Sequence, residues 1–342
     1  MIRFPSIEQF KNTIRAVQHS AQFQGLDENG KAIMDRPVSL PTLKFTGRVK
    51  IHGTNAGIRL DLSSGQLVAQ SRERELSIDS DNAGFCMFTM QNKDYFLETL
   101  QKVAFDYQLS GDDKVVVFGE WAGGNIQSGV AINGLPKFFA IFGLRVIKGE
   151  SDIWLNEDQI AGYFDSGTHE RNIYLVREFG EYEVEIDFNR PELSQNKLVE
   201  LTDAVEKECP VGKYFGKSGI GEGVVYSYSG EFGRHCFKVK GEAHSNSKVK
   251  TTAPVDEAKF NNAKAFAENY VTDARIEQGF TWLKVEGGIA DPDFKDVGSF
   301  IRWVTGDVMK EEQNGIVENN IDTKILAKEI ANIARTWYLA KM

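Results

Sequence analysis

The chain has 342 residues, of which 41% are hydrophobic and 11% aromatic, enough apolar material for one large or two ordinary domains. Its net charge of −9 argues against a broad nucleic-acid-coating surface, which would concentrate lysine and arginine, but allows a local basic site. Three cysteines without CxxC spacing argue against a disulfide framework or zinc knuckle and favour a reducing, cytoplasmic compartment. No stretch approaches the roughly 20 apolar residues of a membrane span, which predicts a protein without one.

Residues 38 to 146 are predicted to form mainly strands. Short β-branched and aromatic runs lie between Gly, Asn, Asp and Ser, a pattern typical of antiparallel sheets. These runs are FTGRVKIHG, NAGIRLDL, QLVAQS, KVVVFGEWAG and KFFAIFGLRVI. Apolar spacings of three and four predict helices over 6–21, 94–107 and 193–208. Strands are expected again over 222–229 and 235–241.

The pattern becomes helical after Pro254. Helical apolar spacing occurs over 256–271, 297–312 and 322–342, and Asp322 is expected to cap the last of these helices. We therefore predict a boundary near residue 250. A mixed α+β domain would span 1–250, and a small helical domain, a candidate for nucleic-acid binding, would span 255–342.

A candidate nucleophile lies in KIHGTN (50–55). The pattern KxxG is common in this chain, starting at Lys44, Lys50, Lys213, Lys238, Lys284 and Lys295. Only Lys50 ends an alternating strand and precedes a compact turn into another strand. A nucleophilic lysine has to lose its proton, so its ordinary pKa of about 10.4 must fall through desolvation or neighbouring cations. Gly53 would let the backbone approach a triphosphate, and Asn55 can donate to a phosphate oxygen.

KIHGTN and the ordered motifs after it resemble the RNA ligase 2 family, which includes the phage T4 enzyme of that type and the kinetoplastid RNA-editing ligases. The resemblance covers roughly residues 40–250. It implies a nucleotidyltransferase (ATP-grasp-like) domain of the α+β class, built from antiparallel sheets with flanking helices. It also implies that Lys50 carries AMP and that Ile51 and Asn55 bind ATP.

Two further motifs of this resemblance concern the phosphate and ribose of ATP. Arg72 in QSRERELS (70–77) corresponds to an arginine that contacts phosphate, a task that suits a permanently charged bidentate donor. Its neighbour Arg74 is on the same face, and either arginine can instead be a solvent-facing charge. Glu120 in VVVFGEWAGG (115–124) corresponds to the residue that accepts hydrogen bonds from the ribose hydroxyls.

The segment KFFAIFGLRV (137–146) resembles the motif whose aromatic residue stacks on adenine. The alignment of Phe142-Gly143-Leu144 with the family's Phe-Asp-hydrophobic ending places Phe139 on the base, with Phe138 as the alternative. Because strand side chains alternate between faces, only one of the two can reach the base and the other packs in the core.

The last two motifs concern metal and triphosphate. Glu222 in EGVVY (222–226) corresponds to a residue that helps to hold the divalent metal. Lys238 and Lys240 in KVKGEAHSNSK (238–248) share one strand face, can both reach the triphosphate, and would lower the pKa of Lys50 by like-charge repulsion. The chain departs from the family pattern at two positions: Ser227 replaces a lysine, and Val49 replaces a glutamate.

Together these features predict an ATP-dependent RNA ligase that uses Mg²⁺ or Mn²⁺ and joins 3′-OH and 5′-phosphate ends through lysyl-AMP and adenylylated RNA. The expected partner is RNA, as a nicked duplex or a 3′-OH end, and the expected state is a monomer. A DNA ligase or a capping guanylyltransferase is an alternative, although the helical pattern after residue 250 does not resemble a five-stranded OB-fold. A catalytically silent RNA-binding protein of the same fold also remains open.

Overall fold

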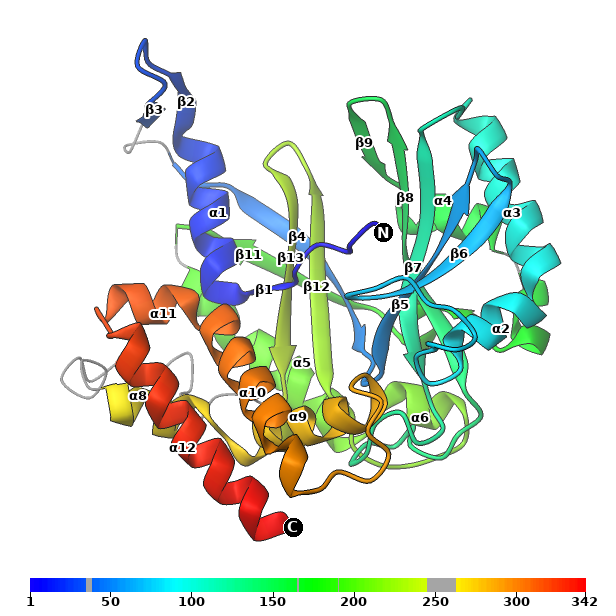
Figure 1. Cartoon of the computed structure of the whole chain (residues 1–342). Helices are drawn as coiled ribbons and strands as arrows, with labels where there is room; N and C mark the ends of the chain where they lie inside the picture. Colours follow the sequence, from blue (N-terminus) through cyan, green and yellow to red (C-terminus); the bar gives the residue numbers. More distant parts are fainter. Residues whose placement is uncertain (35–38, 165, 190, 245–262) are drawn as a thin grey trace. The chain divides into compact units, whose positions relative to one another are not determined.

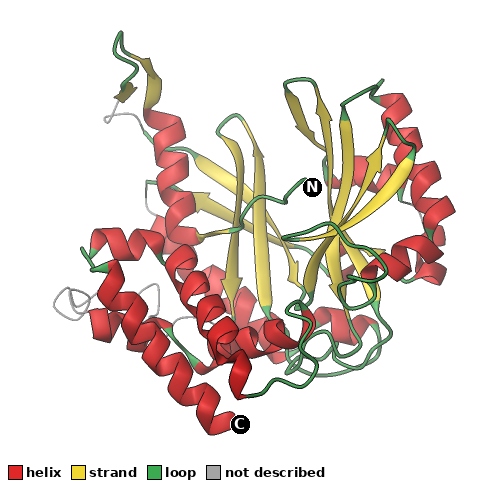
Figure 2. Ribbon diagram, viewed as in Figure 1, coloured by secondary structure: helices red, strands yellow, loops and turns green. Residues whose placement is uncertain are grey.

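Two β-sheets organise the chain as far as Gly241 (Figures 1 and 2). The computed structural model describes residues 1–34, 39–164, 166–189, 191–244 and 263–342. It divides into two compact units, Met1–Gly241 and Glu242–Met342. The limits of the predicted domains, 250 and 255, lie outside the described residues, as does the end of the KVKGEAHSNSK motif after residue 244.

The five-stranded sheet contains the predicted nucleophile. Its strand order is β1 (Glu8–Gln9), β13 (Gly233–Lys240), β12 (Gly223–Gly230), β4 (Thr42–Lys50) and β11 (Tyr182–Asp187). Alternate residues such as Val224 and Phe237 are fully buried against α1 (Phe10–Gln22) and α5 (Gln195–Lys207). Lys50 and Lys240 belong to the other set of alternating residues and therefore lie on the face away from these helices, called the inner face below.

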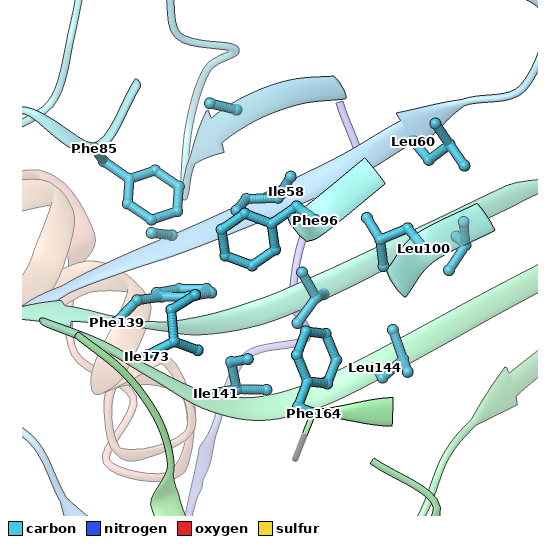
Figure 3. Close-up of a cluster of buried hydrophobic side chains, with 14 of the residues drawn as sticks. Ile58, Leu60, Phe85, Phe96, Leu100, Phe139, Ile141, Leu144, Phe164 and Ile173 are labelled. Atoms are coloured by element: carbon cyan, nitrogen blue, oxygen red, sulfur yellow. The ribbon is translucent and has the colours of Figure 1, made fainter. Parts of the chain in front are cut away.

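The six-stranded sheet contains the strands predicted over NAGIRLDL, QLVAQS, KVVVFGEWAG and KFFAIFGLRVI. Its order is β10 (Ile173–Leu175), β8 (Phe138–Lys148), β7 (Lys114–Ala122), β5 (Thr54–Asp61) and β6 (Gln66–Ser71), and β9 (Ser151–Trp154) pairs with β8. One face packs against α2 (Phe85–Gln91), α3 (Lys93–Asp106) and α4 (Glu157–Tyr163), forming the hydrophobic cluster of Figure 3. The opposite face is the inner face of this sheet.

The two inner faces approach each other. Arg234 of β13 stacks on Trp154 of β9, with the guanidinium carbon 4.2 Å from the ring centroid. Figure 1 shows the N-terminus between the two sheets. Among the described strands, every pairing is antiparallel except β1 with β13 and β10 with β8.

Both units also contain shorter elements. They are the hairpin β2 (Phe23–Leu26) and β3 (Ala32–Met34), the helix α6 (Pro210–Tyr214), and the 3-10 turns η1 (Ser166–Arg171), η2 (Val176–Phe179), η3 (Pro191–Ser194), η4 (Glu242–His244) and η5 (Phe294–Asp296).

The second unit is helical in its described part. Its helices are α8 (Ala263–Tyr270), α9 (Asp273–Val285), α10 (Val297–Glu311), α11 (Gln313–Glu318) and α12 (Thr323–Lys341). The Asp322 carboxylate accepts hydrogen bonds from two amides at the start of α12, as predicted for its cap. Antiparallel sheets with flanking helices, followed by a helical C-terminal region, confirm the predicted fold class. None of the helices in the described ranges is long and apolar enough to cross a membrane.

Candidate functional site

Lys50 lies where the chain crosses from one sheet to the other. It is the last residue of β4, and only three residues separate it from β5. The turn between them is held on both sides of Gly53, whose amide donates to Glu120 Oε1 at 3.1 Å and whose carbonyl accepts from Gln127 Nε2 at 3.1 Å. A Cβ at Gly53 would stand 2.4 Å from the Trp121 carbonyl oxygen. The turn therefore requires glycine for its close approach to β7.

A buried carboxylate joins the basic side chains of the site. Glu222 Oε2 lies 2.8 Å from Lys50 Nζ and 3.1 Å from His52 Nδ1, while Glu222 Oε1 lies 3.0 Å from Lys240 Nζ. The Glu222 side chain is only 1% exposed. Burial alone would raise the pKa of Glu222, but Lys50, Lys240 and His52 outweigh burial and hold that pKa well below its usual range. The carboxylate therefore stays ionised and compensates the surrounding cations.

The two lysines of the KVK motif share the inner face with Lys50. In the strand register Lys240 and Lys50 both pair with Gly223, one from each side, and Lys238 pairs with Val225. Burial lowers the pKa of Lys240, and the charges of Lys50 and Lys238 lower it further, against the opposing effect of Glu222. The arrangement suits an anion, since three ammonium groups converge on one side of the site.

Glu120 and Asn55 lie side by side on the inner face of the six-stranded sheet, where they pair in the β5–β7 register. Arg72 follows directly after Ser71, the last residue of β6, which pairs with Ala56. Burial raises the pKa of Glu120 to about 7, and the charge of Glu222 adds to this, whereas Lys50, the Gly53 amide and Arg72 act in the opposite direction. Asn55 and Arg72, the two residues expected to bind phosphate, are therefore near Glu120, and all three are close to Lys50.

The two arginines of QSRERELS differ in their contacts. The Arg74 guanidinium donates to the carbonyl and hydroxyl oxygens of Ser80 and to the Asp81 carbonyl, so it fastens a loop. The Arg72 side chain is 47% exposed and its charge acts on Glu120. Of the two, Arg72 is therefore the one placed to meet a ligand.

The assignment of Phe139 to the base is wrong in this structure. Phe139 pairs with Trp121, the neighbour of Glu120, so its side chain is on the opposite face of the sheet. It is fully buried in the helix-side cluster, and Figure 3 shows it near Phe85 and Ile173. A ring in this position cannot stack on a base at the inner face.

Two other aromatic residues of β8 lie on the face of Glu120. Phe138, the alternative considered above, is 1% exposed and packs against Tyr174, Phe179 and Phe215. Phe142 is half-buried and is the extra residue of a β-bulge, because Phe118 pairs with Gly143 while Gly119 pairs with Ile141. Phe142 is thus the aromatic side chain of this strand that keeps a free surface on the inner face.

Three further positions named in the sequence analysis have other surroundings: Val49, Ile51 and Ser227. Val49 alternates with Lys50, is 2% exposed and packs in the apolar cluster on the helix side. The Ile51 side chain is also buried in that cluster, so a contact of Ile51 with ATP would come from its backbone. Ser227 is exposed, and its hydroxyl donates to the Thr46 carbonyl at 3.5 Å.

Some supporting residues were not predicted from the sequence. Gln127 binds the Gly53 carbonyl from the loop after β7. Arg48, which shares the inner face with Lys50, is 8% exposed and binds Glu157 and Glu181. Arg48 belongs to the basic run KFTGRVK (44–50), which is its one signal in the sequence, and a loop glutamine gives none.

A divalent metal fits Glu222 only in combination with other ligands. In the described ranges no group of three or more His, Cys, Asp or Glu side chains could hold an ion by itself. Mg²⁺ commonly binds through one or two carboxylates, with substrate phosphates and water as its other ligands. The single ionised Glu222 beside a cationic, anion-binding surface matches that donor set.

Comparison with known proteins gives one family match. The family model described as RNA ligase matches residues 43–240. No curated protein matches the chain in sequence.

Similar solved structures include an RNA ligase of Naegleria gruberi with PPi, at 15% identity and a TM-score of 0.45, covering 71% of this chain and 56% of that one. A mutant of the Naegleria ligase with ATP and Mn has 15% identity, a TM-score of 0.46, and coverages of 71% and 57%. An archaeal ATP-dependent RNA ligase has 16% identity, a TM-score of 0.39, and coverages of 92% and 65%. The chain thus spans little more than half the length of the Naegleria structures, and these low similarities assign nothing beyond the family match.

Proposed function

The chain belongs to the RNA ligase family, and from this premise we propose that it is an ATP-dependent ligase that joins RNA 3′-OH and 5′-phosphate ends, with Lys50 as its nucleophile. The observation that carries the proposal is the position of Lys50. It is the KxxG lysine that lies 2.8 Å from the buried Glu222 carboxylate, which also contacts Lys240, and it precedes a turn fixed by Glu120.

In the first step the neutral amine of Lys50 attacks the α-phosphorus of ATP. A nitrogen–phosphorus bond forms, the bond from that phosphorus to the bridging oxygen breaks, and pyrophosphate leaves. Lys50 gives up one proton to solvent before the attack, and the nitrogen loses a second proton, to solvent or to the departing pyrophosphate, as the nitrogen–phosphorus bond forms. Lys240 and Lys238 would bind the triphosphate and stabilise the negative charge of the departing pyrophosphate.

The remaining contacts position the nucleoside and the metal. Glu120 would accept hydrogen bonds from the ribose hydroxyls, and Arg72 and Asn55 would bind phosphate. Phe142, in place of Phe139, would stack on the base. Glu222 would hold Mg²⁺ or Mn²⁺, an ion that neutralises phosphate charge when bound.

Two transfers complete the proposed cycle. AMP passes from Lys50 to the 5′-phosphate end of RNA, and the 3′-hydroxyl then attacks the adenylylated end, sealing the strand and releasing AMP. We propose a nick in duplex RNA as the substrate, a monomer as the working state and the cytoplasm as its location. The unit from Glu242 onward is a candidate for holding the nucleic acid.

Labelling with ATP that is radioactive at the α-phosphate tests the nucleophile. Wild-type protein should retain label after denaturation, and Lys50→Ala should lose it. Lys44→Ala is a matched control, because Lys44 also begins a KxxG pattern on β4 but pairs with Glu183 at the surface. Wild-type protein without label in either Mg²⁺ or Mn²⁺ would refute the enzymatic proposal and favour a silent RNA-binding protein. Labelling by GTP instead of ATP would indicate a capping enzyme.

A panel of ends tests the substrate. We expect sealing of nicks that carry an RNA 3′-OH strand, compared with single-stranded RNA, RNA on a DNA splint and nicked DNA. Efficient sealing of all-DNA nicks with no sealing of RNA would overturn the RNA assignment and indicate a DNA ligase.

A further inference from the structure

The N-terminal segment Met1–Phe4 crosses the inner face of the six-stranded sheet. The Ile2 amide donates to Gln70 Oε1 at 3.2 Å, and Gln70 Nε2 donates back to the Ile2 carbonyl. Gln70 is 2% exposed. A buried side-chain amide costs folding free energy unless it is hydrogen-bonded, so this two-point contact fixes the segment on β6.

Phe4 continues this contact across the sheet. Its ring packs edge-on against Phe118, Phe142 and Trp154, with centroid distances of 5.3, 4.9 and 5.3 Å. Arg234 of the five-stranded sheet lies over Phe4 at 5.7 Å. Phe4 therefore contacts groups from both inner faces.

The segment lies directly beside the proposed nucleotide contacts. Gln70 precedes Arg72 by two residues, and Phe118 precedes Glu120 by two residues on β7, a separation of about 7 Å along a strand. The half-buried Phe142 is the ring on which we propose that the base stacks, and Phe4 contacts it in a T-shaped arrangement. A base on Phe142 would thus meet Phe4 on the side away from the phosphates.

The strand below Phe4 is adapted to this packing. Gly143 occupies the position at which the family pattern has an aspartate. A Cβ there would stand 3.3 Å from the rings of both Phe4 and Trp154. The replacement of that aspartate by glycine and the presence of a phenylalanine above it therefore fit together.

We propose that Phe4 is a positioning residue for ATP, which forms the end wall of the base site and holds the Phe142 ring in its stacking orientation. The inference depends on the proposed function, because it assigns a role in binding the same nucleotide. It adds a contact from a segment that lies outside the ordered motifs. A segment that merely obstructs the site would have the opposite effect on ATP affinity.

The test is the ATP dependence of Lys50 adenylylation in the full chain. Phe4→Ala should raise the KM for ATP by about tenfold, the effect of losing roughly one aromatic pair, and leave kcat within about twofold. Phe4→Leu, which keeps most of the apolar volume and guards against misfolding, should give a smaller rise. Gly143→Ala should also raise KM. Phe23→Ala, at an exposed aromatic residue of β2, is the control and should change neither value.

The results that would overturn the inference are distinguishable. A lower KM in Phe4→Ala would show that the segment obstructs ATP. A lower melting temperature with an unchanged KM would show a purely structural role. Wild-type protein that takes up no label from ATP would remove the proposed function and this inference together, whereas normal labelling with an unchanged KM removes the inference alone.

Discussion

Glu222→Gln should destabilise the sheet unit strongly in the absence of metal and nucleotide. The substitution removes one negative charge that faces Lys50, Lys240 and His52 at 2.8 to 3.1 Å. Removal of one partner from a fully buried ion pair typically costs about 3–5 kcal/mol. The two lysine side chains are 19% and 14% exposed, so partial hydration lowers the expected loss to about 2–4 kcal/mol.

Urea unfolding in EDTA measures this loss. Hydrogen exchange of peptides from β4 and β12 should be followed, because these strands report the Met1–Gly241 unit separately from the helical unit. Glu183→Gln is the matched control, since Glu183 pairs with Lys44 on the same sheet but is 50% exposed, and should cost less than about 1 kcal/mol. Equal losses in the two variants, or a Glu222→Gln loss below that of the control, would refute the electrostatic reasoning.

Other substitutions test the groups around this carboxylate. The wild-type pKa of about 7 means that the Glu120 carboxylate, which we propose binds the ribose, ionises between pH 6 and 8. Wild-type ATP affinity, measured as the KM for ATP, should therefore rise over this range, and Glu120→Gln should abolish that rise. Since that pKa exceeds the usual 4.5, wild-type stability should fall between these two values as pH rises, and the Gln variant should unfold at a higher urea concentration at about pH 8. Gly53→Ala should reduce lysine labelling by about a hundredfold or more, since its Cβ would meet the Trp121 carbonyl at 2.4 Å and displace the turn; labelling within twofold of wild type would contradict this. Lys240→Met should slow adenylylation by about a hundredfold in single-turnover assays, and an unchanged rate would remove Lys240 from the reaction.

The spacing of apolar residues predicted most helices and strands, and the predictions that failed did so for local reasons. The strands around Lys50 and Glu120 follow from alternating apolar residues between turn formers. The first helix begins at Phe10 instead of residue 6, because Glu8 and Gln9 pair with β13. The helix α9 was not predicted, although Thr272, whose hydroxyl accepts from the Arg275 amide, was an available cap signal.

The alternation of apolar and polar residues along the strands was not enough to predict the site. The motifs singled out Lys50, Glu120, Glu222 and the two lysines, and the structure brings these side chains together. Which β8 aromatic faces Glu120 depended on the β7–β8 register, in which Ala140 pairs with Glu120 and Phe139 pairs with Trp121, and alternation within one strand does not give that register. The contact of Gln70 with Ile2 joins residues far apart in the chain, and no local pattern reports it.

The short turn between β4 and β5 makes the nucleophile part of a joint. Lys50 ends a strand of one sheet, and three residues later the chain enters the other, with the turn bonded to Glu120 of β7 and to Gln127 of the loop after it. A rotation of one sheet against the other about this turn would displace Lys50 least. Groups farther along the strands would sweep larger arcs, so the proposed base and phosphate contacts would shift around ATP while the Lys50 nitrogen moved little. A nucleotide attached to Lys50, as proposed, would stay in place while its surroundings rearranged for the next partner.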